Sequence, residues 1–172
     1  ATQTLVMCPT RELASQVAAE IRRLARFQAN LKVVVLCGGM PIGPQIGSLE
    51  HGAHVVVGTP GRLADHLRKG TLRLTRLTTL VLDEADRMLD MGFGETVAEI
   101  ISQTPKTRQT ILCSATIPED IADLSRDFQR SPQRITVKPV ETVKITETFI
   151  RVDAGSKQEA LLGYLQSNQP DS

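Results

Sequence analysis

Aromatic residues are scarce in this sequence. They make up 3% of its 172 residues, with one tyrosine and no tryptophan. Proteins that hold single-stranded nucleic acid through its bases stack those bases on aromatic side chains, so this composition argues against such a platform. Any nucleic acid bound here must be held mainly by its sugar-phosphate backbone. The net charge of +1 argues neither for nor against such a partner.

Long hydrophobic runs are absent as well. No apolar stretch approaches the length of a membrane span, and the first residues lack the basic and then hydrophobic regions of a signal peptide. The cysteines and histidines show no metal-ligand spacing, and the cysteines occur in short apolar runs. We therefore expect a cytoplasmic protein without a membrane segment, with thiols that are reduced and buried in strands. The cysteines are Cys8, Cys37 and Cys113, and the histidines are His51, His54 and His66.

Short runs rich in valine, isoleucine and leucine recur along the chain. They are continuous rather than alternating, which is typical of strands buried on both faces of a parallel sheet. The predicted strands are residues 5–7, 33–36, 55–57, 80–82, 111–113 and 135–137. Helical periodicity and capping signals predict helices at residues 12–27, 60–69, 95–102, 118–128 and 157–166. Alternating strands and helices predict an α/β fold.

The sequence also predicts where the first domain ends. Residues 137–144 have no helical period and contain a proline, as an extended linker does. We expect one domain over residues 1–139, a linker over 140–147, and the start of a second domain over 148–172. The strand-like run at 148–152 and the helix after it are too few elements to fold alone.

The strongest chemical signal is an apolar strand that ends in acids, namely Asp83, Glu84 and Asp86. Ligands collect at the carboxyl ends of strands in α/β sheets. A carboxylate there can hold Mg²⁺ through its waters, and a neighbouring acid can orient an attacking water. Acids are also favourable at a helix N-terminus for structural reasons alone, so this pattern by itself leaves both interpretations open.

Four other turns follow predicted strands. Pro9-Thr10-Arg11 and Thr59-Pro60-Gly61-Arg62 open helices with free backbone N–H groups and an arginine, a suitable combination for gripping a phosphate. Gly38-Gly39 allows close approach of the backbone. Ser114 and Thr116 carry hydroxyls that can bond a neighbouring carboxylate or cap the next helix. Each turn alone is better explained as an ordinary strand-to-helix connection.

Taken in order, these motifs resemble the DEAD-box helicase family. They are PTRELA at 9–14, GG at 38–39, TPGR at 59–62, DEAD at 83–86 and SAT at 114–116. Residues 21–27 and 65–71 further resemble the bacterial DbpA-type subgroup, whereas the literal DEAD and SAT disfavour the DEAH and DExH families. The resemblance implies a RecA-like parallel sheet flanked by helices, the P-loop NTPase fold. It also implies an ATP-dependent RNA helicase that acts in ribosome assembly or RNA remodelling.

The resemblance implies roles for individual residues. Asp83 would act through Mg²⁺ and its waters, and Glu84 would position or activate the hydrolytic water. Asp86 would contact the Ser114–Thr116 segment, which would link the ATP state to RNA handling. ATP, Mg²⁺, RNA and a second RecA-like domain are the implied cofactors and partners. The RNA path would be lined, without sequence specificity, by Pro9, Thr10, Arg11, Gly38, Gly39, Thr59, Pro60, Gly61 and Arg62.

One part of the family pattern does not occur in this sequence. There is no GxxxxGK[ST] phosphate-binding loop, so the lysine and amides that cradle the β- and γ-phosphates are missing, together with the strand before that loop. We therefore expect the chain alone to hydrolyse no ATP, and the strand at 135–137 to lack its ladder partner. A catalytically inactive fragment that binds RNA or a protein, and a DNA translocase with a similar core, remain alternatives.

Overall fold

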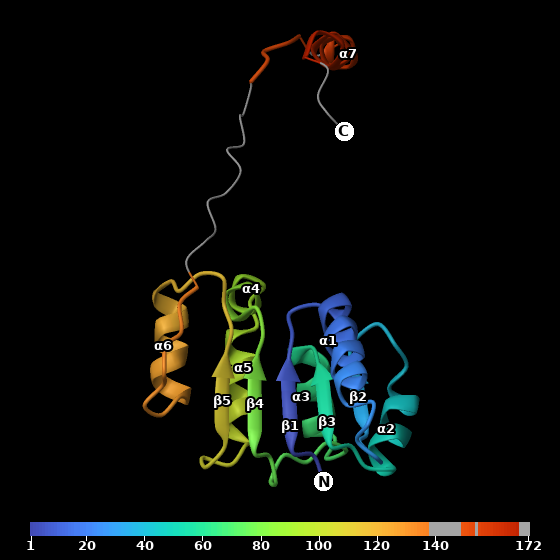
Figure 1. Cartoon of the computed structure of the whole chain (residues 1–172), viewed down its shortest axis with the longest axis vertical. Helices are drawn as coiled ribbons and strands as arrows, with labels where there is room; N and C mark the ends of the chain where they lie inside the picture. Colours follow the sequence, from blue (N-terminus) through green and yellow to red (C-terminus); the bar gives the residue numbers. More distant parts are fainter. Residues whose placement is uncertain (138–148, 154, 169–172) are drawn as a thin grey trace. The chain divides into compact units, whose positions relative to one another are not determined.

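A parallel β-sheet organises the computed structural model, which describes residues 1–137, 149–153 and 155–168 (Figure 1). The strands in the described residues lie in the order β2-β3-β1-β4-β5, and every neighbouring pair is parallel. They are β1 (Thr4–Met7), β2 (Val33–Leu36), β3 (Val55–Gly58), β4 (Thr79–Leu82) and β5 (Gln109–Leu112). The strands predicted between residues 5 and 113 are therefore confirmed, with small shifts at their ends.

Helices connect these strands, which confirms the α/β fold. They are α1 (Arg11–Leu24), α2 (Ile42–Glu50), α3 (Pro60–Arg68), α4 (Ala85–Asp90), α5 (Gly94–Ser102) and α6 (Glu119–Phe128). The sequence did not predict α2 or α4. Two glycines and a proline interrupt the pattern of α2, and α4 has only 6 residues, too few to show a helical period.

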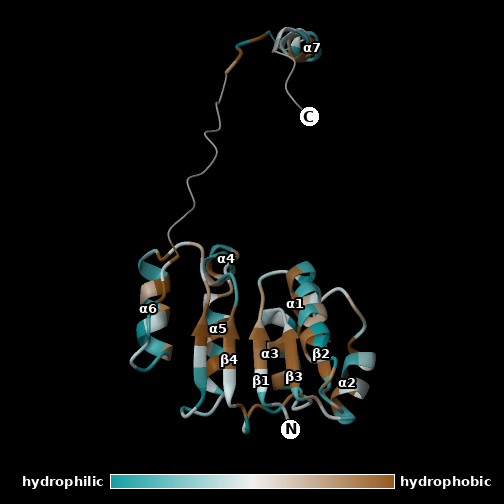
Figure 2. Ribbon diagram, in the orientation of Figure 1, coloured by the Kyte–Doolittle hydropathy of each residue, from teal (hydrophilic) through white to brown (hydrophobic). Residues whose placement is uncertain are grey.

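The two faces of the sheet pack against different helices. Leu5 and Met7 of β1 belong to an apolar cluster that includes buried residues of α3, α5 and α6. Val6, between them, belongs to a second cluster with Ala14 and Ala18 of α1. Figure 2 shows the apolar character of the central strands, which are covered on both faces. This double burial explains why the strands read as continuous apolar runs.

The strand predicted at 135–137 does not form. Ile135 and Val137 are 82% and 86% exposed, and no described strand pairs with them. Apolar residues alone do not make a strand, because an extended segment needs a neighbour for its backbone hydrogen bonds. Residues 149–152 of the predicted run at 148–152 also form no strand. Thr148 and the predicted linker at 140–147 lie outside the described residues.

The prediction of three buried thiols is wrong for one of them. Cys8 and Cys37 are buried, but Cys113 is exposed, because it follows β5, the last strand of the described sheet. Burial raises the pKa of the Cys8 thiol to about 12, so this group is neutral. All three cysteines are free thiols.

The chain divides into two compact units, Ala1–Gln133 and Arg134–Ser172. The first contains the sheet and α1 to α6. The second contains α7 (Lys157–Asn168), which confirms the helix predicted at 157–166. None of the helices in the described residues is both long and apolar enough to span a membrane.

Gly58, at the end of β3, is where the sheet leaves least room for a side chain. A Cβ atom there would collide with the backbone carbonyl oxygen of Leu36 in β2. Gly58→Ala should therefore push the two strands apart and lower the free energy of unfolding by about 1–3 kcal/mol. Urea denaturation measures this change.

Gly47 in α2 provides the matched control. A Cβ atom there meets nothing within 4 Å. Gly47→Ala should raise the free energy of unfolding by roughly 0.5–1 kcal/mol, because alanine favours a helix interior. Equal effects of the two substitutions would contradict the packing described for β2 and β3.

Candidate functional site

The register of the sheet places all five motifs at the same end of the strands. Each strand ends opposite the end of its neighbour, so Leu36, Gly58, Met7, Leu82 and Leu112 form one row. Because the strands are parallel, the turns that follow them meet at the carboxyl end of the sheet, where ligands of α/β proteins bind. The sequence-predicted site residues therefore lie at one end of the sheet.

The strand order divides this end of the sheet into two contiguous parts. The turns after β2, β3 and β1 lie side by side, and they contain residues 38–39, 59–62 and 9–12. We call them the amide turns, because each offers backbone N–H groups. The turns after β4 and β5 contain residues 83–86 and 114–116, and we call them the acidic turns. The sequence alone could not show this division, since it depends on the strand order.

The acidic turns begin with a strained backbone. The Asp83 N–H continues the ladder by donating to the Met7 carbonyl at 3.0 Å, and Asp83 Oδ1 accepts from the Glu84 N–H at 3.1 Å. Glu84 then has φ 49° and ψ 54°, a left-handed conformation that residues other than glycine rarely adopt. This sharp reversal starts α4 immediately after β4. Strain of this kind concentrates at functional sites.

Asp86 ties the two acidic turns together. Its Oδ2 accepts from the Thr116 hydroxyl at 2.7 Å and from the Thr116 N–H at 2.9 Å. Its own N–H donates to Ser114 Oγ at 3.3 Å, which satisfies one of the free donors at the start of α4. The contact expected between Asp86 and the 114–116 segment is thus present. The alternative, in which these hydroxyls cap α6, is not, because Pro118 precedes α6 without a side-chain cap.

The same contacts set the charge of Asp86. The Thr116 hydroxyl is the largest influence holding the pKa of this carboxyl below its ordinary value, although partial burial opposes it. The N–H groups of Thr116 and Arg87 act in the same direction as the hydroxyl. Asp86 therefore remains ionised at neutral pH and accepts hydrogen bonds only. Glu84 in turn pairs with Arg87 Nη1 at 3.2 Å.

Thr10 and Arg11 shape the amide turn that follows β1. Thr10 caps α1, because its Oγ1 accepts from the Leu13 N–H at 3.2 Å. The N–H groups of Arg11 and Glu12 have no acceptor within the helix and remain available. The exposed Arg11 guanidinium lies where a Cβ atom of Gly39 would be, and Gly39 has φ +75°. The backbone conformation therefore favours glycine at 39, and a side chain there would displace the flexible Arg11 guanidinium.

Arg62 does not lie free in solvent as a phosphate grip would. Its side chain is 13% exposed, and Nη1 donates to the Met40 carbonyl and to Gln45 Oε1, each at 3.0 Å. Pro9 and Pro60 are also buried. Pro9, Pro60 and Arg62 therefore support the amide turns largely from the interior of the fold. Thr10, Arg11, Gly39 and Gly61 lie nearer the surface.

Sequence reasoning missed two buried polar residues next to Arg62. Gln45 was missed because it lies in α2, whose helical pattern is obscured. His66 was considered as a metal ligand and as part of the 65–71 resemblance, but not as a core residue, although it lies three residues after Leu63 on the buried face of α3. A histidine at a core position of a helix signals a buried hydrogen-bond partner, and that signal was present in the sequence.

Removal of the Thr116 hydroxyl should raise the pKa of Asp86 towards its ordinary value. Thr116→Val removes the 2.7 Å hydrogen bond but keeps the 2.9 Å bond from the backbone N–H. Because the folded pKa is depressed, this bond stabilises the fold above the unfolded pKa of about 3.9, and the contribution is lost as pH falls through the folded pKa. The variant should lose stability at neutral pH but little in strong acid. A carboxyl ¹³C NMR titration measures the pKa, and an unchanged midpoint would contradict the assignment.

A family model for the DEAD/DEAH box helicases matches residues 1–124. ATP-dependent RNA helicase DbpA of Escherichia coli (strain K12) is 51% identical over 172 residues, which are 99% of this chain and 38% of that protein. DbpA of Bacillus subtilis (strain 168) is 44% identical over 172 residues, again 99% of this chain and 36% of that protein. The chain thus spans little more than a third of the length of these relatives.

Solved structures show the same fold. A DEAD box protein from the hyperthermophile Methanococcus jannaschii superposes with a TM-score of 0.77 at 38% identity, over 96% of this chain and 45% of that chain. A hypothetical ATP-dependent RNA helicase from Sulfolobus tokodaii gives a TM-score of 0.72 at 42% identity, over 77% and 39% of the two chains. The expected RecA-like architecture is therefore confirmed. With the matched motifs and the shared fold, the chain belongs to the DEAD/DEAH box helicase family.

Proposed function

We propose that this chain serves as part of an ATP-dependent RNA helicase, which couples ATP binding and hydrolysis to RNA binding and local duplex unwinding. One observation carries this proposal: the strand order separates the amide turns from the acidic turns at the carboxyl end of one sheet. A nucleic-acid backbone and a nucleotide can then bind side by side on one rigid support. Residues 1–139 are proposed as the first RecA-like domain, 140–147 as a linker, and 148–172 as the start of a second RecA-like domain.

The acidic turns fit a site for Mg²⁺ and ATP. Asp83 uses Oδ1 to accept from the Glu84 N–H, so Oδ2 is without a protein partner in the described contacts. Mg²⁺ prefers such oxygen ligands and needs few carboxylates, because it keeps several waters and binds nucleotide phosphates. We propose that Asp83 holds the ion through water and that Glu84 positions or activates the hydrolytic water. The bound ion would neutralise charge that develops on the phosphates.

The link from Asp86 to residues 114–116 fits a coupling role. Ser114 Oγ donates to the Thr116 carbonyl at 2.6 Å, so this segment is held both internally and by Asp86. A structural change at Asp83 or Glu84 would therefore reach the segment after β5, because Asp86 follows them within two or three residues, in the first turn of α4. We propose that Asp86, Ser114 and Thr116 connect the ATP state to RNA handling.

The amide turns fit the backbone of RNA. Their free N–H groups are those of Arg11 and Glu12 at α1, Gly61 and Arg62 at α3, and the glycines at 38–39. Backbone amides and a guanidinium bond phosphate oxygens without reading the bases, so the predicted binding is independent of sequence. All nine RNA-lining residues named above belong to this proposal, with Pro9, Pro60 and Arg62 acting through the shape of the turns. Action in the cytoplasm, in ribosome assembly or other RNA remodelling, rests on the resemblance to DbpA-type helicases.

RNA binding by the chain should be weak, independent of base sequence and sensitive to salt. For single strands, each phosphate contact contributes about −0.7 to the slope of log K against log salt concentration. Arg11→Ala should weaken binding of oligouridine and oligoadenine equally and make the slope shallower by about one contact. Fluorescence anisotropy at several salt concentrations measures both quantities.

Arg23→Ala is the matched control. Arg23 is an exposed arginine of α1 that pairs with Glu20, near the other end of the helix. Its removal should leave RNA affinity unchanged. A strong base preference would contradict a path built from backbone contacts, and tighter binding of DNA would favour the DNA translocase.

The chain alone should hydrolyse no ATP, because its sequence has no phosphate-binding loop. Joined to such a loop and a second RecA-like domain, it should support RNA-stimulated turnover. In that protein, Glu84→Gln should abolish turnover but keep ATP binding, since an amide preserves the shape but cannot accept the proton. Asp83→Asn should instead weaken Mg²⁺-dependent nucleotide binding. Phosphate release and nucleotide affinity measure the two effects, and equal loss of affinity in both variants would refute this division of roles.

A further inference from the structure

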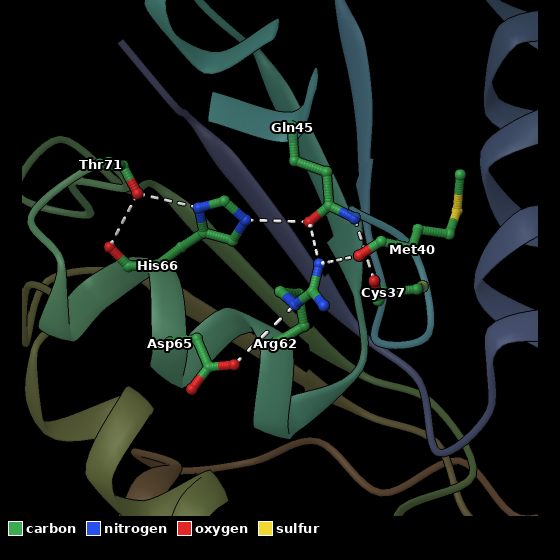
Figure 3. Close-up of polar contacts among 7 residues, drawn as sticks. All are labelled: Cys37, Met40, Gln45, Arg62, Asp65, His66 and Thr71. Carbon is green, nitrogen blue, oxygen red and sulfur yellow. Dashed lines mark hydrogen bonds and ion pairs between the residues drawn. The ribbon is translucent and has the colours of Figure 1, made fainter. Parts of the chain in front are cut away.

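A polar network with buried members contacts Cys37 and Met40, the residues on either side of the amide turn at 38–39 (Figure 3). Its members Gln45 of α2 and His66 of α3 are 7% and 0% exposed. Neither residue belongs to the five motifs that resemble the family, although His66 lies within residues 65–71, which resemble the DbpA-type subgroup. Buried polar groups need partners, so the contacts of these two side chains show what they hold in place.

The Gln45 amide has three polar neighbours. Its Nε2 donates to the Cys37 carbonyl at 3.0 Å, while its Oε1 accepts from Arg62 Nη1 at 3.0 Å and lies 2.9 Å from His66 Nε2. Arg62 Nη1 also donates to the Met40 carbonyl at 3.0 Å. Cys37 and Met40 flank the two glycines. The network therefore anchors the amide turn by a backbone carbonyl on each side of Gly38-Gly39.

His66 fixes which way the Gln45 amide faces. The ring lies between Gln45 Oε1 and Thr71 Oγ1, which is 2.8 Å from Nδ1. Burial, with a smaller influence from Arg62, lowers the pKa of His66, so the ring is neutral at pH 7. Because Gln45 Oε1 is an acceptor, we assign the ring proton to Nε2. The Thr71 hydroxyl then donates to Nδ1 in preference to the His66 carbonyl, which lies 3.1 Å from Thr71 Oγ1. A flipped amide would place its NH₂ group against two donors, so His66 and Arg62 together exclude the flip.

In the described part of the chain, the two glycines do not hold the turn through hydrogen bonds of their own. Two adjacent glycines have more conformational freedom than any other dipeptide. In the described contacts, the N–H groups of Gly38 and Gly39 have no protein acceptor. Without anchors, the turn would have to be ordered each time a ligand bound, which lowers affinity.

We propose that Gln45 and His66 are positioning residues for RNA binding, which fix the amide turn at 38–39 through Arg62 and the Cys37 carbonyl. This inference rests on the proposed RNA function for its ligand, but the anchoring of the turn can be measured without RNA. It assigns to Arg62 a role beneath the RNA path, where the arginine holds the turn that presents N–H groups to a phosphate.

The test compares substitutions within the network. Gln45→Leu and His66→Leu remove the hydrogen bonds at similar volume, whereas His66→Gln keeps a donor able to reach Gln45 Oε1. Thr104→Val is the control, because Thr104 is equally buried and its hydroxyl donates to the Ile101 carbonyl, outside the network. ¹⁵N relaxation and amide exchange report on Gly38 and Gly39, and fluorescein-labelled oligouridine reports on RNA affinity.

Both leucine variants should mobilise the Gly38 and Gly39 amides and weaken RNA binding about tenfold, as expected when a binding turn must be ordered on association. His66→Gln and Thr104→Val should stay within about twofold of the unchanged chain. Leucine variants with rigid glycine amides, or with undiminished RNA affinity, would overturn the inference. An equal loss in Thr104→Val would also overturn it, because the effect would then be one of general stability.

Two results separate this inference from the proposed function. If the unchanged chain binds no RNA while the leucine variants still mobilise the turn, the RNA function fails and the anchoring role stands. If the leucine variants do not fold, the ring ¹⁵N spectrum of His66 in the unchanged chain shows whether His66 donates to Gln45 Oε1. A neutral ring protonated at Nε2 supports the network, and protonation at Nδ1 alone overturns it, because Gln45 Oε1 would then have no donor from His66.

Discussion

The pairing of β1 with both β3 and β4 is the interaction on which the rest of the structure depends. Met7 lies opposite Gly58 on one side and Leu82 on the other, so the ends of the central strands are level. The ladder continues one residue further, through the N–H groups of Cys8 and Asp83. This alignment turns motifs that are far apart in the sequence into neighbours. A shift of register between β1 and β4 would separate the acidic turns from the amide turns.

Each part of the site is held by a polar contact across two elements. In the acidic turns, Asp86 of α4 bonds Thr116 after β5, next to the strained backbone of Glu84. In the amide turns, Gln45 of α2 and Arg62 of α3 bond the carbonyls on either side of Gly38-Gly39. The sheet thus sets the level of the turns, and these side chains set their shape. Both are conditions for the proposed helicase function, because phosphoryl transfer and phosphate binding depend on donors held in place beforehand.

The sequence predicted the features that depend on local pattern and on motifs. Doubly buried strands read as apolar runs, and the DEAD and SAT segments were recognisable as residues that would meet. The sequence also indicated that residues 135–137 would lack a ladder partner, and no strand in the described part of the chain pairs with them. It failed where the outcome depends on a side-chain partner elsewhere in the chain, because Arg62 has the charge of a phosphate ligand but lies against Gln45. His66 and Gln45 are 21 residues apart, on helices whose packing no short pattern reveals.

We infer that RNA binds by its backbone at the turns after β2, β3 and β1. Backbone amide chemical-shift mapping of the ¹⁵N-labelled chain, titrated with a short oligouridine, tests it most directly. We expect the signals of residues 10–12, 38–39 and 61–62 to shift together, and we expect added salt to reverse these shifts. Shifts centred on the opposite end of the sheet, or shifts that persist at high salt, would contradict it.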